Sequence, residues 1–382
     1  MVNGKLRVAL VGLGFGGSFA PIWADHPDVE QIGICDNNRE LAEKFKKEYP
    51  QLHIYDSFEQ ILADDTIDAV HLVTGIPDHA KQTVQVLESG KHCACTVPMA
   101  TTLAQIRDIF NAVEKSGKNY MMMETTLYTY QYFFIKEMIE KGELGQIQLL
   151  RGSHYQDMEN WPSYWNGLPP FWYGTHAIAP LVGLSNSRIE RVSCLGSGKM
   201  RDELVKQYGN PFPTETAHFR FSNGLAAEAT RTLFETAHVY KEGLDVYGSK
   251  KTFEWGFSDD SNPIITSLID NDKIRRGKDT PSEIVEMPNY YSKLPQQLWK
   301  YTVGSQYDAT NPQQSLKKGA GAGHHGSHAH MVHEFVRSII ECRKAWINEE
   351  LAANITAAGI CAHESALRDG EWITIPKFCA EP

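Results

Sequence analysis

The sequence predicts an α/β protein with an N-terminal doubly wound parallel sheet, followed by a second α/β domain with a large, mostly antiparallel, open sheet. Three features support this prediction. A glycine-rich turn follows the first apolar run, apolar runs then alternate with amphipathic stretches to about residue 125, and strand-like runs with period-two alternation take over from residue 146. The 382 residues, of which 42% are apolar, suffice for two domains with separate cores.

In the first part of the chain, apolar runs of strand length alternate with stretches whose apolar residues recur at helical spacing. The expected strands are 6–11, 31–35, 69–74, 92–96 and 119–123, and the expected helices are 17–25, 38–48, 57–63, 78–89 and 102–116. Repeated βα units imply a parallel sheet that binds its ligand at the carboxyl ends of the strands.

The turn after the first strand reads Gly-Leu-Gly-Phe-Gly-Gly over residues 12–17, and Asp36 ends the next strand. Gly12 permits a tight turn, Gly14 lets the backbone approach a pyrophosphate, and Gly17 lets the helix pack closely. Asp36 is placed to accept hydrogen bonds from the adenosine ribose, which favours NAD over NADP because its charge repels a 2′-phosphate. Arg39 keeps NADP as a less favoured alternative. Residues 1–125 are therefore expected to form a Rossmann NAD-binding domain.

From residue 126 the chain is expected to form the second domain, which extends to residue 382. A helix over 130–141 precedes strands at 146–154, 189–196, 216–221, 225–232, 244–248 and 251–255, and a further helix lies near 174–183. Residues 258–321 are rich in Pro, Asn, Asp and Ser, and we expect an irregular excursion there. Helices at 328–344 and 351–368 are expected to pack back on the first domain.

Composition and charge argue against several classes of protein. The net charge of −10 argues against nucleic acid and anionic membrane as partners. No run approaches eighteen apolar residues, and the first strand begins too early for a signal peptide, unless one has been removed. The seven scattered cysteines favour reduced thiols and a cytoplasmic location.

The chain resembles the Gfo/Idh/MocA oxidoreductases, a family of sugar-handling, nicotinamide-dependent enzymes. The resemblance rests on the glycine turn, on Thr-Gly-Ile-Pro-Asp-His at 74–79, on Glu-Ser-Gly-Lys-His at 88–92 and on Lys-Gly-Glu-Leu-Gly-Gln-Ile at 141–147. It implies a Rossmann domain followed by a domain whose open sheet face lines the sugar site and often forms oligomer contacts. A homo-oligomer with a small carbohydrate or glycoside as its ligand is therefore expected.

Two departures from the family pattern concern acid–base chemistry. Family dehydrogenases usually carry Glu-Lys-Pro after the fourth strand, whereas this chain has Val97 where that lysine stands. They also carry an Asp four residues before the substrate-domain histidine, whereas here Trp172 precedes His176 by four. Valine offers no group that accepts a proton.

What remains resembles the family's NAD-dependent glycosidases, such as glycoside hydrolase family 109. The similar segments are Tyr-Gly-Thr-His at 173–176, Met-Glu at 123–124 with Tyr128, His-Tyr-Gln-Asp at 154–157, and Gly-His-His-Gly at 323–326. The resemblance implies oxidation of the sugar at C3, elimination at C1, addition of water and return of the hydride, with NAD tightly bound throughout.

The resemblance also implies residue roles. His176 is expected beside the nicotinamide and the C3 hydroxyl, and Tyr173 is expected to take the C2 proton, which requires NAD⁺ or a nearby cation to favour its phenolate. The expected cofactor-binding residues are Gly12, Gly14, Phe15, Gly16, Gly17, Asp36, Asn37, Thr74, Ile76, His79, Thr96, Val97, Pro98 and Glu124. The expected substrate-contacting residues are Tyr128, Tyr155, Asp157, Trp172, His325 and His328.

Several alternatives stay open. The histidines at 324–333 have some helical metal-ligand spacing, but no carboxylate or cysteine cluster accompanies them, so we expect no metal. Strand alternation puts Tyr155 and Asp157 on one face and His154 on the other, and either face could meet the site. Glu124 could instead cap a helix, and His238 is a weaker candidate for a base. A net sugar dehydrogenase is the main alternative function, and a catalytically silent NAD- or sugar-binding regulator is a minor one.

Overall fold

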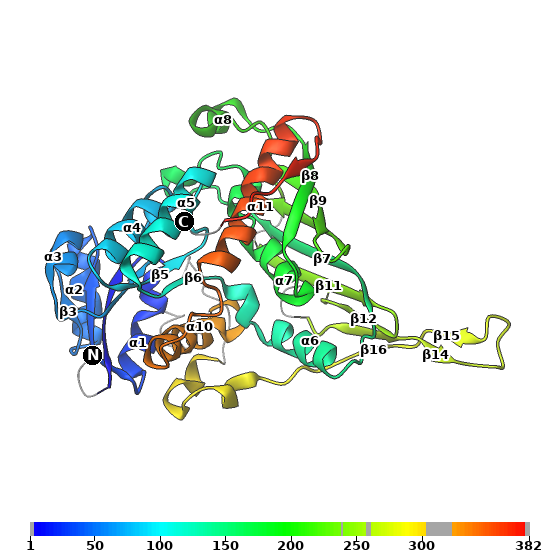
Figure 1. Ribbon diagram of the computed structural model, residues 1–382, viewed down its shortest axis with the longest axis horizontal. Coiled ribbons are helices and arrows are strands. Elements are labelled where there is room, and N and C mark those ends of the chain that lie inside the picture. Colours follow the sequence, from blue (N-terminus) through cyan, green and yellow to red (C-terminus); the bar gives the residue numbers. More distant parts are fainter. Residues whose placement is uncertain (1–3, 238–239, 257–260, 303–322, 379–382) are drawn as a thin grey trace. The chain divides into compact units, whose positions relative to one another are not determined.

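The structure is a computed structural model, and it describes residues 4–237, 240–256, 261–302 and 323–378 (Figure 1). Contacts between Cα atoms divide the chain into two units. Unit 1 comprises Met1–Tyr130, Asn289–Ala353 and Phe378–Pro382, and unit 2 comprises Gln131–Pro288 and Asn354–Lys377. Each unit is therefore assembled from segments that are far apart in the sequence.

Unit 1 contains a six-stranded parallel sheet with the order β3-β2-β1-β4-β5-β6. Its strands are β1 (Leu6–Val11), β2 (Val29–Cys35), β3 (His53–Ile54), β4 (Ala69–Leu72), β5 (His92–Thr96) and β6 (Tyr120–Met123). The strands β4, β5 and β6 are buried almost throughout, as expected for a parallel sheet with both faces covered. The predicted doubly wound sheet is confirmed.

Five helices connect these strands, and three of them begin at side-chain caps. Their bounds are α1 (Ala20–Asp25), α2 (Arg39–Glu48), α3 (Phe58–Ala63), α4 (His79–Glu88) and α5 (Leu103–Ser116). Asn38 caps α2, and Thr102 with Gln105 forms a capping box at α5. The first helix is shorter than the predicted 17–25, because a 3₁₀ turn (η1, Gly16–Ser18) follows the glycines. Two more 3₁₀ turns are η2 (Ile76–Asp78) and η3 (Thr125–Tyr128).

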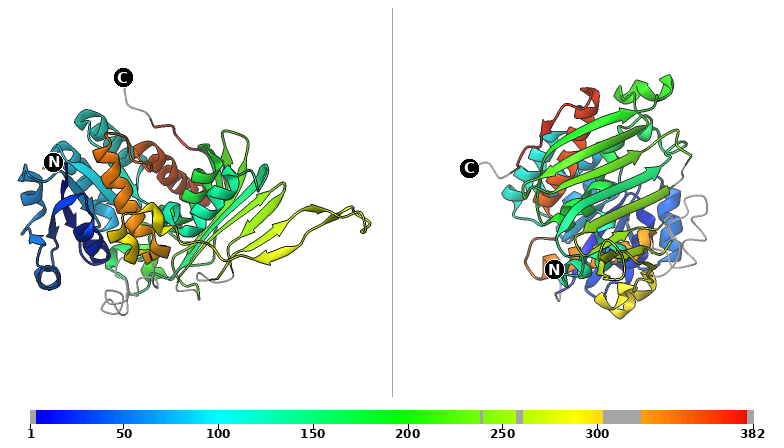
Figure 2. Two further views of the ribbon diagram at one scale, coloured as in Figure 1. Left: turned by 90° about the horizontal axis from the view of Figure 1, so that it is seen from below. Right: turned by 90° about the vertical axis from the view of Figure 1, so that its right-hand side faces the viewer.

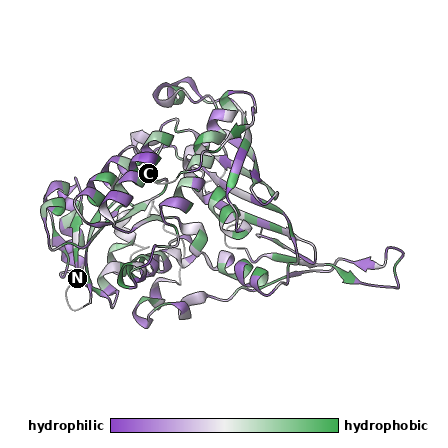
Figure 3. Cartoon of the chain, in the orientation of Figure 1, coloured by the Kyte–Doolittle hydropathy of each residue, from purple (hydrophilic) through white to green (hydrophobic). Residues whose placement is uncertain are grey.

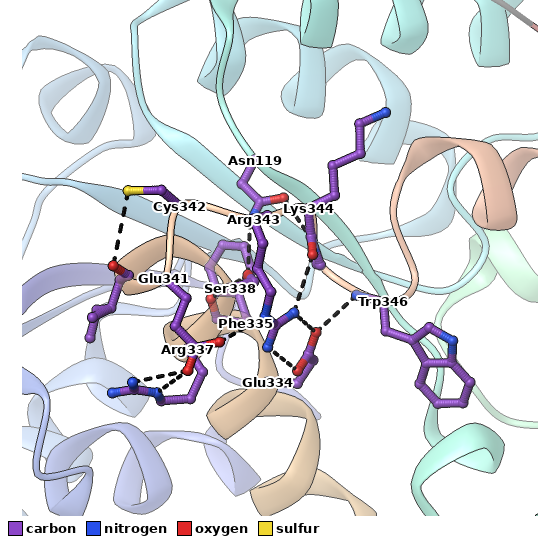
Figure 4. Close-up of polar contacts among 12 residues, drawn as sticks. Asn119, Glu334, Phe335, Arg337, Ser338, Glu341, Cys342, Arg343, Lys344 and Trp346 are labelled. Carbon is purple, nitrogen blue, oxygen red and sulfur yellow. Dashed lines mark hydrogen bonds and ion pairs between the residues drawn. The ribbon is translucent and has the colours of Figure 1, made fainter.

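A late segment of the chain completes unit 1. It contains the 3₁₀ turns η6 (Tyr290–Lys293) and η7 (Gln296–Tyr301) and the helix α10 (Gly323–Ile340). Figure 4 shows the polar contacts at the end of α10. Arg343 forms a two-pronged ion pair with Glu334, and the Asn119 amide, just before β6, donates to Ser338 Oγ over 2.7 Å. These bonds fix α10 to the parallel sheet.

Unit 2 contains a nine-stranded sheet with the order β16-β13-β12-β11-β7-β10-β9-β8-β17. Its bounds are β7 (Ile147–Gln156), β8 (Ile189–Ser197), β9 (Thr214–Phe221), β10 (Ala226–Thr232), β11 (Tyr240–Gly248), β12 (Lys251–Glu254), β13 (Ile264–Ser267), β16 (Ser282–Ile284) and β17 (Ile373–Thr374). Only β10 and β7 pair in parallel; the other described pairs are antiparallel. The predicted mostly antiparallel sheet is confirmed, and the right-hand view of Figure 2 looks onto its strands.

The expectation of an irregular excursion after residue 258 is wrong for part of that segment. β13 and β16 extend the sheet, and β14 (Ile269–Asp270) pairs with β15 (Lys278–Asp279) as a hairpin that projects beyond it (Figure 1). These strands have two to four residues, too few for alternation to stand out. β14 contains the apolar Ile269, whereas both residues of β15 are charged, and Figure 3 shows the hydropathy along this hairpin.

Helices cover one face of this sheet. Their bounds are α6 (Tyr130–Glu140), α7 (Thr175–Ser185), α8 (Asp202–Tyr208) and α11 (Glu349–Leu367), which enters unit 2 at Asn354, with 3₁₀ turns η4 (Ser163–Trp165) and η5 (Pro170–Tyr173). α7 packs on β7, β10 and β11. A Cβ at Gly152 would lie 2.0 Å from the Ala177 carbonyl oxygen, so glycine lets α7 approach β7 closely.

Candidate functional site

In unit 1, the carboxylate of Asp36 joins the end of β2 to the glycine turn. Its Oδ2 accepts a hydrogen bond from the Leu13 N–H over 2.6 Å, and its Oδ1 accepts one from the Asn38 N–H over 2.7 Å. Asn37 beside it is exposed. Asp36 therefore lies at the carboxyl end of β2 and next to the turn after β1, the position that the sequence motif requires of a ribose acceptor.

The glycines of this turn have different surroundings. At Gly12, where φ is +89°, a Cβ would lie 2.2 Å from the Val73 carbonyl oxygen, so only glycine fits. At Gly17 a Cβ would lie 2.3 Å from the Phe45 ring, so the close packing it permits is against α2. At Gly14 nothing lies within 4 Å of that position. Bare backbone facing open space is what a pyrophosphate cradle needs, so the turn fits a dinucleotide.

His79, at the start of α4, clamps the ends of two strands. It is 1% exposed, and its Nδ1 lies 2.8 Å from the Pro98 carbonyl oxygen while its Nε2 lies 3.0 Å from that of Thr74. Burial disfavours the charged ring, but Cys95 and the two carbonyl oxygens outweigh it and raise the pKa of His79 to about 9. Both ring nitrogens donate to backbone, so His79 supports the cofactor edge and is not free to contact NAD itself.

The other predicted cofactor residues near this edge are partly engaged within the protein. The Thr74 hydroxyl donates to a side chain of α4, and the Thr96 hydroxyl donates to a β4 carbonyl over 3.3 Å. Ile76 and Val97 are buried. Glu124 caps η3, since its Oε1 accepts from the backbone and hydroxyl of Thr126 over 3.0 and 2.9 Å. At least one carboxylate oxygen of Glu124 therefore caps a helix, which was the alternative expectation for this residue.

The histidine turn in the first residues of α10 packs in unit 1. His324, His325 and Gly326 have positive φ angles of 47°, 55° and 76°, which forms a left-handed turn. His328 is fully buried and stacks on Phe19 at 4.2 Å, with Phe15 5.5 Å away edge-on. His328 therefore packs beside the glycine turn, and its expected contact with the substrate stays a prediction. His325 contacts the Tyr130 ring, and Tyr128 contacts the Trp346 ring.

In unit 2, the predicted catalytic pair comes together on a turn that leads into α7. Tyr173 ends η5, Gly174 follows, and His176 lies in the first turn of the helix. The two rings meet edge to face at 5.4 Å, and Trp165 contacts the other side of Tyr173 at 4.7 Å. A Cβ at position 174 would lie 2.5 Å from the Phe171 ring, so glycine permits this tight entry into the helix.

β7 contributes a residue different from the expected ones. His154 is fully buried, and its ring lies 4.9 Å from that of His176 and 4.9 Å from that of Tyr240. Alternation along the strand directs Tyr155 to the opposite face. Asp157 accepts the Glu159 N–H in a local turn. The structure thus brings His154, and not Tyr155, to the Tyr173–His176 pair.

Trp172 points to a second group of side chains. Its ring contacts Tyr208 and His363 at 5.8 and 5.9 Å. His363 Nδ1 lies 2.5 Å from Glu215 Oε1, and the other Glu215 oxygen accepts the Phe171 N–H over 2.9 Å. Glu215 therefore holds the turn that carries Tyr173.

The sequence alone did not identify Glu215, Arg231 and Glu242, and it left open whether the strand face with His154 meets the site. Each shares the inward phase of its strand with apolar residues, such as Ala217 and Phe219 in β9. An ionisable residue at a strand position where the alternation predicts an apolar one is the sequence feature that could have identified these residues.

Three further observations concern metal ligands, membrane spans and cysteines in the described part of the chain. There, no three or more His, Cys, Asp or Glu side chains are arranged to hold a metal ion. Among the same residues, no helix combines the length and the apolar character needed to span a bilayer. None of the six described cysteines forms a disulfide. His238 lies outside the described residues.

Two family models match the chain in succession. The model described as the oxidoreductase family, NAD-binding Rossmann fold, matches residues 6–124, and that of the GFO/IDH/MocA C-terminal domain matches residues 132–254. The chain belongs to the Gfo/Idh/MocA oxidoreductase family. Unit 1 therefore holds the family's NAD-binding Rossmann domain, and the predicted family is confirmed.

Curated relatives include glycosyl hydrolase family 109 proteins. One from Phocaeicola vulgatus is 31% identical over 227 residues, which is 53% of this chain and 48% of the relative. Another, from Bacteroides thetaiotaomicron, is 28% identical over 285 residues, which is 65% of this chain and 61% of the relative. The matched region thus spans only about half of the length of these relatives.

Solved structures share the whole fold at low identity. A levoglucosan dehydrogenase in complex with NADH and levoglucosan superposes with a TM-score of 0.77 at 18% identity, over 98% of this chain and all of that one. The myo-inositol 2-dehydrogenase from Lactobacillus plantarum gives a TM-score of 0.72 at 17% identity, over 97% of this chain and all of that one. At such identity these matches establish the fold.

Proposed function

We propose that this enzyme cleaves a glycoside in a redox-neutral cycle, with NAD retained between turnovers. The observation that carries the proposal is the combination of Val97 at the end of β5 with the Tyr173–His176 contact in unit 2. Family dehydrogenases have a lysine at the valine position, and without it the oxidation needs another base. The resemblance to glycosyl hydrolase family 109 proteins supports the same reading.

In the proposed cycle, the glycine turn and Asp36 would hold NAD, which would supply the hydride acceptor for the sugar C3 and the hydride donor for the final reduction. His176 takes the proton of the C3 hydroxyl and returns it to the C3 oxygen when C3 is reduced again. Tyr173, as phenolate, takes the C2 proton; the C–H electron pair forms the C1–C2 double bond, and the C1–O bond breaks with its pair leaving on the aglycone, which takes up a proton. Water then adds at C1, with a proton returned to C2. The net reaction is hydrolysis, so atoms and electrons balance.

NAD, and not NADP, is the proposed cofactor. The Asp36 carboxylate faces the turn where a ribose would lie, and its charge opposes a 2′-phosphate. Arg39, which could favour that phosphate, is bound by Glu43 over 2.8 Å and by Asp56.

A net sugar dehydrogenase is the second candidate function. The structural likeness to a levoglucosan dehydrogenase and a myo-inositol 2-dehydrogenase favours it. In that case His176 would serve as the base in place of the missing lysine, and NADH would accumulate with the glycosidic bond intact.

One experiment separates the two candidates. A panel of aryl glycosides is incubated with the protein as purified, and aglycone release and nicotinamide absorbance are recorded together. Many turnovers without net NADH, with solvent deuterium entering C2, support the proposal; NADH formed in step with added NAD⁺ contradicts it. Tyr173→Phe and His176→Ala should each reduce turnover by orders of magnitude with NAD binding retained, whereas Tyr247→Phe, elsewhere on the sheet, serves as the control.

A homo-oligomer joined through the open sheet face is also proposed from the family resemblance. Sedimentation of the purified protein tests this, and a monomer at micromolar concentration contradicts it.

A further inference from the structure

Four ionisable side chains lie in one row across the centre of the unit 2 sheet. The register pairs Glu215 with Arg231, Arg231 with His154, and His154 with Glu242, on strands β9, β10, β7 and β11. Directly opposed residues project from the same face of a sheet, and none of the four is more than 1% exposed. Burying so many ionisable groups costs free energy, and hydrophobic residues of similar size would serve packing as well. The row therefore calls for a role besides stability.

Arg231 is the cation of this row, and four neutral acceptors contribute to fixing its position. Nε donates to the Tyr173 carbonyl oxygen over 2.8 Å, and Nη2 donates to Gln156 Oε1 over 2.8 Å. Nη1 donates to the carbonyl oxygens of His154 and Thr232 over 3.2 and 2.7 Å. Carbonyl and amide oxygens satisfy the hydrogen bonds of a guanidinium without cancelling its charge.

The fixed guanidinium lies close to the Tyr173 ring. Its Cζ is 5.3 Å from the ring centroid. A cation near an acidic group favours the charged form of that group. The phenolate of Tyr173 is that charged form.

Other charged or titratable groups face Tyr173 as well. His176 meets its ring from α7, and His154 from β7 lies behind His176. Glu215 from β9 reaches the same turn at Phe171, but it also accepts a bond from His363 of α11. Glu242 from β11 accepts the Tyr240 hydroxyl. Both carboxylates thus have hydrogen-bonded partners of their own.

We propose that Arg231 is a positioning residue that holds the Tyr173 turn and stabilises the Tyr173 phenolate. This inference rests on the proposed function, in which that phenolate takes a proton from a substrate carbon. By increasing the fraction of phenolate at neutral pH, Arg231 increases the fraction of enzyme that is ready for elimination. It supplies the nearby cation that a tyrosine base requires.

The test follows the titration of Tyr173 directly. 3-Fluorotyrosine is placed at position 173, and its ¹⁹F resonance is followed against pH in the protein saturated with NAD. Arg231→Met should shift the titration midpoint upward by about 1 pH unit or more, and Arg231→Lys, which keeps the charge, by less. The lower-pH limb of kcat/KM should shift in the same order.

A second variant avoids truncating the buried arginine. Gln156→Glu places a carboxylate at the acceptor of Nη2, so it should neutralise the guanidinium and also raise the midpoint. Gln148→Glu adds the same charge at an exposed position of β7 and should leave the midpoint unchanged. Equal midpoints in the unsubstituted protein, Gln156→Glu and a folded Arg231 variant would overturn the inference.

Failure of this inference can be told apart from failure of the proposed function. If NADH accumulates and the glycosidic bond stays intact while the midpoint still shifts, the glycosidase proposal fails and the Arg231–Tyr173 coupling stands. If turnover is redox-neutral and the midpoint does not shift, only the coupling fails.

Discussion

His363 Nδ1 lies 2.5 Å from Glu215 Oε1, and through this contact α11 is bonded to the strand that supports the Tyr173 turn. Neither side chain is exposed by more than 7%. The two residues are 148 positions apart in the sequence. The contact thus ties the late helix of unit 2 to the part of the sheet where we place the chemistry.

Removing the charge of Glu215 should destabilise unit 2. In Glu215→Gln the shape is retained, but the hydrogen bonds from His363 and Phe171 no longer reach an ionised acceptor. We expect the free energy of unfolding to fall by about 2–3 kcal/mol, measured by urea denaturation. Glu228→Gln, which disrupts a half-exposed ion pair with Arg151, should change it by about 1 kcal/mol or less. Equal effects would show that burial of Glu215 does not matter.

Two substitutions in the glycine turn should separate folding from cofactor binding. Gly14→Ala adds a methyl group to open space, so the melting temperature without NAD should stay the same while NAD affinity falls at least about tenfold, or 1.4 kcal/mol. Gly12→Ala drives a Cβ into the Val73 carbonyl and requires a left-handed φ, so it should lower stability itself. Calorimetry and NAD titration check both predictions. Unchanged NAD affinity in Gly14→Ala would show that this turn does not bind the pyrophosphate.

Asp36→Asn tests the preference for NAD. The asparagine keeps an oxygen for the Leu13 N–H but loses the charge that opposes a 2′-phosphate. The ratio of NADP to NAD affinity should rise about tenfold, which corresponds to 1.4 kcal/mol. Arg39→Ala is the matched control and should leave this ratio unchanged, because Arg39 is engaged by Glu43 and Asp56. A protein that already prefers NADP would contradict the assignment.

Acid should destabilise unit 1 through His71. The Trp23 indole N–H donates to His71 Nδ1 over 3.1 Å, and burial lowers the pKa of His71 to about 3. The unfolded chain then binds the proton first, so stability is lost as pH falls from about 6.5 towards 3. At pH 4.5 the loss from this residue is about 2–3 kcal/mol.

His71→Gln offers the indole an acceptor that does not titrate. The drop in unfolding free energy between pH 7 and pH 4.5 should therefore shrink by about 2–3 kcal/mol. His53→Gln replaces an exposed histidine and serves as the control. An undiminished drop in His71→Gln would assign the acid sensitivity to other groups.

Much of the fold follows from local patterns. Apolar periodicity places β1, β2, β4, β5 and β6 to within about two residues but misses β3, which has only two residues. The glycine turn with Asp36 places the cofactor edge. The pair Tyr173 and His176 follows from the resemblance of the short segment 173–176 to the family's glycosidases. These features are local, so a single sequence carries them.

Features that depend on register could not be predicted in the same way. His154 meets Arg231 and Glu242 only because β7 pairs with both β10 and β11, and no local pattern sets that pairing. Similarly, the sequence marks His79 as polar and near the cofactor, but not that both of its ring nitrogens face carbonyl oxygens. The short strands β13 and β16 gain order from the sheet beside them and not from a pattern of their own.

The division of unit 1 into distant segments has a consequence for biosynthesis. Phe19 and Ser18 follow the glycine turn near the start of the chain, yet the ring that covers them belongs to His328. A ribosome must add about three hundred residues before that ring emerges. An apolar surface of the nascent Rossmann domain therefore stays uncovered until the strands β7 to β16 of unit 2 have been translated. Expression of residues 1–130 alone would leave that surface without its His328 cover, and we expect exposed apolar surface of this kind to promote aggregation of the isolated domain.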